Sequence, residues 1–295
     1  MYKTRMDKNQ IPIVWTAIIT PFLENGAIDF TSLEHLVRMQ EKFGNGILFL
    51  GSTGESLNLT NLEKKQVIDW VQNREFTVPT MCGVGGFCLD STLSWIKAIN
   101  EYKFDAYLLV TPPYAKPGAQ GQLAWFTKLM DVSQKPCVLY NVPGRTACSL
   151  HRTALRELAK HKNLLGIKES SGSIDEFIAY KQTLPNHAVY CGDDIMMPHF
   201  AKEGACGLVS VASNAWPEQV QNYTQKCLNQ TFDDFDLWKQ ACENLFTTSN
   251  PVPIKHLLHK RGLIKTSLVK APLSHLDMGD DTDLIKYDQK IVLWV

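Results

Sequence analysis

The sequence predicts an α/β protein built as a closed (β/α)8 barrel, a TIM barrel, with a small C-terminal helical region. Eight short apolar runs recur along the chain at intervals of roughly 20 to 30 residues, which is the size of one strand plus one helix. Helical patterns fill the gaps between them. A G-x-G-x-x-G turn is absent after the first run, which disfavours the alternative, an open doubly wound sheet.

The eight runs are apolar throughout, as expected for parallel strands that are covered on both faces. Eight such strands fit a closed barrel better than an open sheet. They are VWTAII, GILFLG, PTMCGV, AYLLVT, CVLYN, LLGIK, AVYCG and GLVSV, with carboxyl ends at Thr20, Gly51, Gly83, Thr111, Tyr140, Lys168, Gly192 and Val211.

The first three predicted helices cover residues 32–43, 63–74 and 90–102, where apolar residues recur at helical spacing. Thr60 and Glu63 have the spacing of a capping box, which predicts where the second of these helices begins.

The strand pattern ends after Trp216. Residues 217–250 and 253–265 have helical patterns, and Asn250, Pro251 and Pro253 break the run between them. We therefore expect a catalytic barrel over residues 1–225 and a C-terminal helical region over residues 226–295 that packs on it.

Charge and hydropathy exclude several classes of protein. Thirty basic and thirty acidic residues cancel, whereas a nucleic-acid-binding protein usually has a basic excess. No apolar run approaches the roughly 18 residues of a membrane span. The N-terminal segment MYKTRMDKNQIPIVW has no apolar signal-peptide core. We expect a cytoplasmic protein that binds neither nucleic acid nor membranes.

The sequence offers no clear metal site. None of the eight cysteines forms a C-x-x-C pair, so we interpret them as small buried residues that stay reduced. His256 and His259 lie three positions apart without an evident third ligand. Asp193 and Asp194 are interpreted as caps of the following helix rather than as ligands of a divalent ion.

Lys168 ends a buried strand, LLGIK, at the edge of the barrel where catalytic residues lie. Two interpretations are open: a solvated lysine, or a desolvated amine that forms a Schiff base. Burial lowers the pKa of a lysine because desolvation penalises the charged form. Strand alternation predicts that Leu164, Gly166 and Lys168 share one face, with Gly166 leaving space for a bound group.

Other polar groups are predicted at the same edge. Tyr140 ends the preceding strand, and its phenol is a candidate proton shuttle or an aromatic cap of the core. The GSTGES segment, with Ser52 and Thr53, can hold a carboxylate through N–H and hydroxyl groups, or is only a tight turn. Arg145 follows a Pro-Gly turn and suits a carboxylate, or lies on the surface.

The segments GSTGES, TPPYAKP, YNVPGRT, GIKESSG, YCGDD and NPVPIK, in this order and spacing, resemble the dihydrodipicolinate synthase family of class I, pyruvate-dependent aldolases. The likeness extends from Ile13 to Lys270. It implies a Schiff base between Lys168 and pyruvate and a relay of protons through Tyr140. The remaining implied site residues are Ser52 and Tyr114 (from a neighbouring subunit) in the relay, Thr53 at the pyruvate carboxylate, Arg145 at the carboxylate of L-aspartate 4-semialdehyde, and Gly192 and Val209 in the pocket wall.

The resemblance implies a condensation of pyruvate with L-aspartate 4-semialdehyde in lysine (diaminopimelate) biosynthesis. It implies no metal and no organic cofactor, and a homotetramer of two tight dimers. Ser52 stands where the family usually has threonine and also suits N-acetylneuraminate lyase, so another pyruvate-dependent or sugar-acid aldolase is the first alternative. A non-catalytic barrel that binds a keto acid is the second.

Members of the resembled family that lysine inhibits bind it with histidine, asparagine, glutamate and tyrosine side chains. The corresponding positions here hold other residues, so we expect insensitivity to lysine. They are Asn61, Lys64, Phe87, Ser91 and Pro113.

Overall fold

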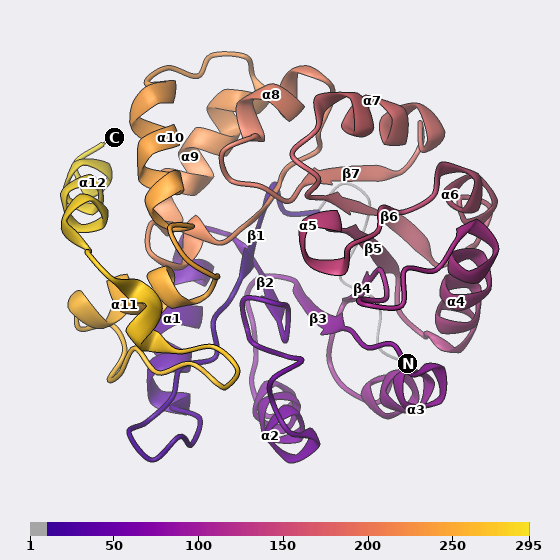
Figure 1. The fold of residues 1–295 in the computed structure, drawn as a ribbon, viewed down its shortest axis with the longest axis horizontal. Helices are drawn as coiled ribbons and strands as arrows, with labels where there is room; N and C mark the ends of the chain where they lie inside the picture. Colours follow the sequence, from indigo (N-terminus) through magenta and orange to yellow (C-terminus); the bar gives the residue numbers. More distant parts are fainter. Residues whose placement is uncertain (1–10, 295) are drawn as a thin grey trace.

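The computed structural model describes residues 11–294 and has the predicted closed barrel of eight parallel strands, in which each strand pairs with the next and β8 pairs with β1 (Figure 1). Most of the N-terminal segment for which no signal peptide is expected, residues 1–10, lies outside the described residues. The strands are β1 (Val14–Ala17), β2 (Gly46–Phe49), β3 (Thr80–Val84), β4 (Ala106–Val110), β5 (Cys137–Asn141), β6 (Leu164–Glu169), β7 (Ala188–Cys191) and β8 (Leu208–Ser210).

Helices surround the barrel, and further helices follow it. Thr60 and Glu63 form the predicted capping box at the start of α2. The helices are α1 (Phe30–Lys42), α2 (Asn61–Gln72), α3 (Leu89–Ile99), α4 (Ala119–Val132), α5 (Pro143–Thr146), α6 (Arg152–Leu158), α7 (Ile174–Thr183), α8 (Met197–Lys202), η1 (Ala212–Asn214), α9 (Pro217–Leu228), α10 (Phe235–Asn244), α11 (Val252–Lys260), η2 (His275–Met278) and α12 (Thr282–Val292).

Apolar side chains form two layers. The smaller cluster lies inside the barrel and is built from strand residues such as Trp15, Leu48 and Met81. Their sequence neighbours, for example Ile47 and Phe49, point outward and pack with the helices. This alternation is why strands that are apolar throughout form a barrel with helices outside.

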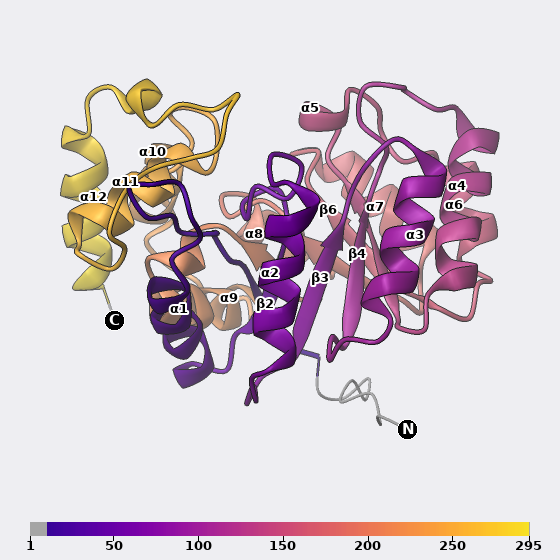
Figure 2. The same cartoon turned by 90° about the horizontal axis from the view of Figure 1, so that it is seen from below.

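The C-terminal helices α10, α11 and α12 lie beside α1 and α9, on one side of the barrel (Figures 1 and 2). Residues 217–250, which have a helical pattern, form two helices, because residues 229–234 separate α9 from α10. Trp216 Nε1 donates to Asp288 Oδ1 at 2.7 Å, which ties α12 to the barrel. None of the helices within residues 11–294 has the length and apolar character that crossing a membrane requires.

A β-bulge corrects the predicted alternation along β6. The register between β5 and β6 shifts after Cys137, so that Val138 pairs with Gly166. Leu164 consequently packs in the outer cluster, and Leu165 takes the place inside the barrel. The extra residue of a bulge turns the side chains that precede it in the strand to the opposite face of the sheet. Leu164 therefore does not share the face of Lys168.

Candidate active site

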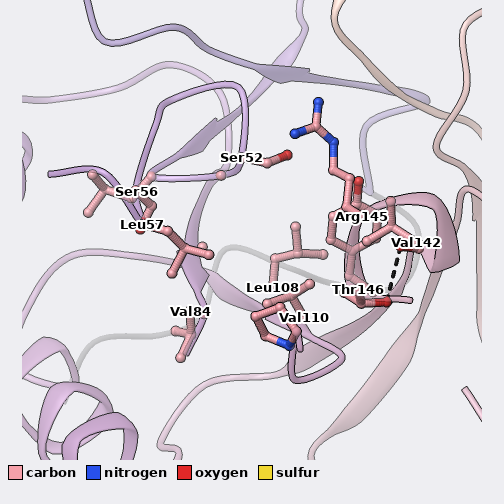
Figure 3. Close-up of a pocket in the computed structure, with 15 residues that line it drawn as sticks. Ser52, Ser56, Leu57, Val84, Leu108, Val110, Val142, Arg145 and Thr146 are labelled. Carbon is pink, nitrogen blue, oxygen red and sulfur yellow. Dashed lines mark hydrogen bonds between the residues drawn. The ribbon is translucent and has the colours of Figure 1, made fainter. Parts of the chain in front are cut away.

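A cavity of about 220 Å³ opens at the carboxyl ends of strands β2 to β5. Ser52, Tyr140 and Arg145 line it together with apolar side chains. Ser52 and Arg145 lie on one side, with Leu108 and Val110 on the other (Figure 3). An apolar pocket with a few convergent polar groups is the usual form of a small-molecule site.

Lys168 is buried, with 4% of its surface exposed, so the solvated-lysine interpretation is wrong. It pairs with Tyr140 across β5 and β6, and its Nζ lies 4.3 Å from the centroid of the Tyr140 ring. Tyr140 also lines the cavity, whereas Lys168 lies outside the cavity wall. The phenol ring therefore lies in contact with both the cavity and the amine.

Two glycines near Lys168 have different roles. A Cβ at Gly192 would lie 2.0 Å from Ser170 Oγ and 2.7 Å from Lys168 Cε, so this glycine makes room for both side chains. A Cβ at Gly166 would lie 1.9 Å from the carbonyl oxygen of Ala188. Gly166 is thus required by the close approach of β7, and the expected space for a bound group is not its role.

Lys255 is the other buried lysine in the described part of the chain, and it differs from Lys168 in forming an ion pair. Its Nζ forms an ion pair with Glu55 and donates to Leu268 O at 2.9 Å. Burial lowers the pKa of Lys255 to about 8, and the Glu55 charge opposes that shift. In the described residues Lys168 has no ion-pair partner; its contact is the face of Tyr140. A buried amine that forms no salt bridge is uncommon unless it has a chemical role.

Two carboxylates, Asp193 and Asp194, follow β7. Burial raises the pKa of Asp193, and the charge of Lys168 opposes this shift. Burial also raises the pKa of Asp194 to about 6. Asp194 does not cap the helix that follows it. Its Oδ1 accepts from Ser210 Oγ and its Oδ2 from the N–H of Val211 at 2.9 Å, and no side chain caps α8.

Asn250 connects two predicted site residues. Thr53 is buried, and its Oγ1 lies 2.9 Å from Asn250 Nδ2, which donates to it. Arg145 Nη2 donates to the carbonyl oxygen of Asn250 at 3.3 Å. The sequence predicted Asn250 only as a helix break. Its place in the NPVPIK segment was the available signal for this role.

The remaining predicted residues lie at different depths. Val209 is buried inside the barrel. Tyr114 follows β4, is 90% exposed and has a φ of 68°, so this single chain does not bring it to the cavity. Positive φ in a tyrosine is uncommon and marks a constrained loop position.

Histidines and cysteines do not gather into a metal site in residues 11–294. His256 Nε2 lies 2.7 Å from Asp281 Oδ2. Five cysteines are buried, as expected, but Cys88 is exposed at the start of α3.

The barrel and its site define the class: an enzyme of the (β/α)8 type, with its reactive groups at the carboxyl ends of the strands. The chain belongs to the dihydrodipicolinate synthetase family, whose model matches residues 11–287, and is a lyase of the aldolase type.

Three known proteins illustrate the relationship. The 4-hydroxy-tetrahydrodipicolinate synthase of Wolbachia pipientis wMel is 44% identical over 95% of this chain and 96% of its own. A chloride-inhibited dihydrodipicolinate synthase from Acinetobacter baumannii, solved with pyruvate, is 31% identical, with a TM-score of 0.87 over 97% of this chain and 100% of its own. The enzyme of Cyanidioschyzon merolae, solved with lysine bound, is 26% identical, with a TM-score of 0.88 over 96% of this chain and 99% of its own.

Proposed function

We propose that the protein is a 4-hydroxy-tetrahydrodipicolinate synthase, which condenses pyruvate with L-aspartate 4-semialdehyde in lysine (diaminopimelate) biosynthesis. The observation that carries the proposal is the buried Lys168 amine, which contacts the Tyr140 ring and forms no salt bridge within residues 11–294. The names of the relatives support the same activity.

In the proposed reaction, the amine of Lys168 attacks the ketone carbon of pyruvate. Loss of water from the carbinolamine leaves an imine, and loss of a methyl proton converts the imine to an enamine. Tyr140 supplies and removes protons in these steps, because both addition and dehydration need acid–base help.

The enamine carbon then attacks the aldehyde of the second substrate and restores the imine. The amino group of that substrate adds to the imine carbon and displaces the Lys168 amine, which closes the product ring. Lysine is regenerated, so the cycle needs neither a metal nor an organic cofactor.

The other site residues have binding roles in this proposal. Ser52 and Thr53 hold the pyruvate carboxylate, and Arg145 receives the carboxylate of the semialdehyde through its planar guanidinium. Gly192 and Val209 shape the pocket. Ser52 lacks the methyl group that restricts a threonine rotamer, and we expect a working but slower relay.

Tyr114 is exposed on its own chain, which supports its delivery to the site of a neighbouring subunit. We propose at least a dimer, and a homotetramer of two such dimers, in the cytoplasm. We assign residues 1–225 to the catalytic barrel and residues 226–295 to the C-terminal helical region; residues 1–10 and 295 lie outside the described residues. Sedimentation analysis of the purified protein tests the assembly.

We also propose that lysine does not inhibit the enzyme. Asn61, Lys64, Phe87 and Ser91 line one cavity, whereas Pro113 lines the catalytic cavity. Lys64 would repel a cationic ligand, and Ser91 offers it no charge. If millimolar lysine halved the initial rate, this part of the proposal would be wrong.

Trapping tests the Schiff base directly. Incubation with pyruvate and borohydride is expected to add a three-carbon fragment to Lys168, and peptide mass spectrometry locates it. Lys255, the other buried lysine, is the internal control. An adduct on Lys255, or one that persists in Lys168→Ala, contradicts the assignment.

A coupled assay with L-aspartate 4-semialdehyde and the downstream reductase tests the substrate. Turnover excludes the non-catalytic keto-acid-binding barrel. A pyruvate adduct without turnover of the semialdehyde would favour another aldolase, such as N-acetylneuraminate lyase.

A further inference from the structure

A buried ion pair joins the loop of residues 50–59, which carries Ser52 and Thr53, to helix α11. Glu55 of the loop and Lys255 of the helix form this pair, and they are 200 positions apart in the sequence. Both side chains are buried, and removing two charges from water is costly. The proposed reaction uses neither group, so the pair calls for another role.

Both oxygens of the Glu55 carboxylate accept hydrogen bonds. Oε1 accepts from Lys255 Nζ, and Oε2 accepts from the backbone N–H of Lys270 at 2.6 Å. Lys255 Nζ also donates to Leu268 O at 2.9 Å. The carboxylate therefore bridges α11 and the segment that follows it. An amide in its place would set an N–H donor against one of these two donors.

The charged groups around the pair are matched one to one. The Lys270 ammonium pairs with Glu63 of α2, whereas the Lys255 ammonium pairs with Glu55 of the loop. The centroid of the Phe22 ring lies 3.9 Å from Lys255 Nζ and 4.9 Å from Lys270 Nζ. Loss of the Glu55 carboxylate would therefore leave the buried Lys255 ammonium without its counter-charge.

The backbone of the loop needs support from outside. Residues 50–59 form no helix or strand. Leu50 and Glu55 have φ of 54° and 57°, in the left-handed region. Side chains other than glycine are unfavourable there and persist only where the surrounding structure holds them. The ion pair holds one of these two residues by its side chain.

The residues just before Glu55 lead directly to the catalytic cavity. Thr20 Oγ1 donates to Gly54 O at 2.8 Å. Ser52 is exposed and lines the cavity, while Thr53 is buried beside it. The positions of their hydroxyl groups thus depend on how firmly the following residues are held, and the ion pair is the charged contact that holds them.

We propose that Glu55 is a positioning residue of the catalytic site. Its ion pair with Lys255 fixes the loop of residues 50–59, so that Ser52 and Thr53 can bind the carboxylate of pyruvate. The inference rests on the proposed function, because pyruvate is the ligand that the loop holds in it. Glu55 touches no reacting group and acts only through the loop.

Borohydride trapping of the full chain at varied pyruvate concentration tests the proposal. It gives the half-saturating pyruvate concentration and the maximal amount of adduct on Lys168. For Glu55→Gln we expect the half-saturating concentration to rise about tenfold or more, as for loss of a charged hydrogen bond, with an unchanged maximum. A merely structural role would lower the maximum, because unfolded chains form no adduct, and would leave the half-saturating concentration unchanged. That result would overturn the proposal.

The double variant Glu55→Gln/Lys255→Met separates positioning from stability. It leaves no buried charge unpaired, so it also carries the test if Glu55→Gln fails to fold. Its half-saturating pyruvate concentration is still expected to be raised, because no ion pair then ties the loop to α11. A wild-type value in the double variant would show that the pair serves stability alone and would overturn the proposal.

Glu63→Gln is the matched control. It removes the neighbouring ion pair with Lys270 and keeps the capping box of α2, in which glutamine can replace glutamate. We expect the half-saturating pyruvate concentration of the wild type. An increase as large as that in Glu55→Gln would show that any charge lost from this cluster weakens pyruvate binding, which contradicts a specific role of Glu55.

Hydrogen exchange separates this inference from the proposed reaction. The N–H of Ser56 donates to Gly51 O at 3.3 Å, and the N–H of Leu59 donates to Glu55 O at 3.1 Å. Both N–H groups are expected to exchange faster in Glu55→Gln and in the double variant than in the wild type. A wild type that formed no adduct would refute the Schiff-base proposal, whereas unchanged exchange at these two positions would overturn the role of Glu55 whether or not the adduct forms.

Discussion

Asn250 Nδ2 donates a 2.9 Å hydrogen bond to Thr53 Oγ1, although the two residues are 197 positions apart. Asn250 belongs to the segment before α11, and Thr53 to the loop after β2. The contact fixes the loop that carries Ser52 and Thr53 against the C-terminal part of the chain, and the same asparagine accepts from Arg145 through its carbonyl oxygen.

Asn250→Ala is expected to raise the KM for pyruvate about tenfold with a smaller effect on kcat, because a buried hydroxyl that loses its partner costs roughly 1–3 kcal/mol. Asn250→Asp, which can accept a hydrogen bond from Thr53, is expected to recover part of the loss. Steady-state kinetics with varied pyruvate gives the answer, with Asn244→Ala on α10 as the surface control. An equal increase in the KM for both substrates would instead indicate that the substitution disturbs the whole site.

Tyr140→Phe is expected to lower kcat by about 10²–10⁴-fold, the usual contribution of a positioned acid–base group. The ring face that contacts Lys168 is retained, so binding of pyruvate should change little. The control is Tyr102→Phe, which removes a phenol that donates to Asp69 on the surface. Unchanged kcat in Tyr140→Phe would exclude Tyr140 from the proton relay.

Arg145→Ala is expected to reduce kcat/KM for the semialdehyde at least about tenfold, since a charged hydrogen bond is lost. The pyruvate adduct on Lys168 should still form, because Arg145 is proposed to bind the second substrate only. Borohydride trapping and the coupled assay are run on the same sample. If adduct formation fell in parallel with turnover, the proposal that Arg145 binds only the carboxylate of the semialdehyde would be wrong.

Lys255→Met is expected to lower the free energy of unfolding by about 3–5 kcal/mol, because it leaves the buried Glu55 without a counter-charge. The double variant Glu55→Gln/Lys255→Met is expected to recover most of that loss, since both buried charges are removed. Denaturant unfolding of the wild type and the two variants measures this. A double variant that is less stable than Lys255→Met would show that the pair is favourable in its own right.

The pH dependence of this pair has a defined sign. The pKa of Lys255 is lowered from 10.5 to about 8 in the folded state, so between these values the unfolded chain binds more protons. The contribution of Lys255 to the free energy of unfolding therefore rises from pH 8 to pH 10.5, by about 3 kcal/mol in total. The measurement is the difference between wild type and Lys255→Met across this range. A difference that is flat or falls with pH would contradict the lowered pKa.

Local patterns in the sequence predicted much of the barrel. The eight apolar runs became eight strands, and the capping box at Thr60 and Glu63 begins α2, because burial periodicity and capping depend on residues close in the chain. Helix ends and the break at residues 229–234 were predicted less well, since packing decides them. The motifs also led to Lys168 and Tyr140, which adjacent strands bring side by side.

The sequence by itself thus determined the order of strands and helices along the chain and the candidate residues at the carboxyl ends of the strands. Only the tertiary structure decided that a bulge turns Leu164 outward, that Gly166 serves the approach of β7, and that Asn250 holds Thr53. These facts depend on how distant segments meet when the barrel closes. Local periodicity carries no information about such contacts, because their geometry is set by chain segments far apart in the sequence.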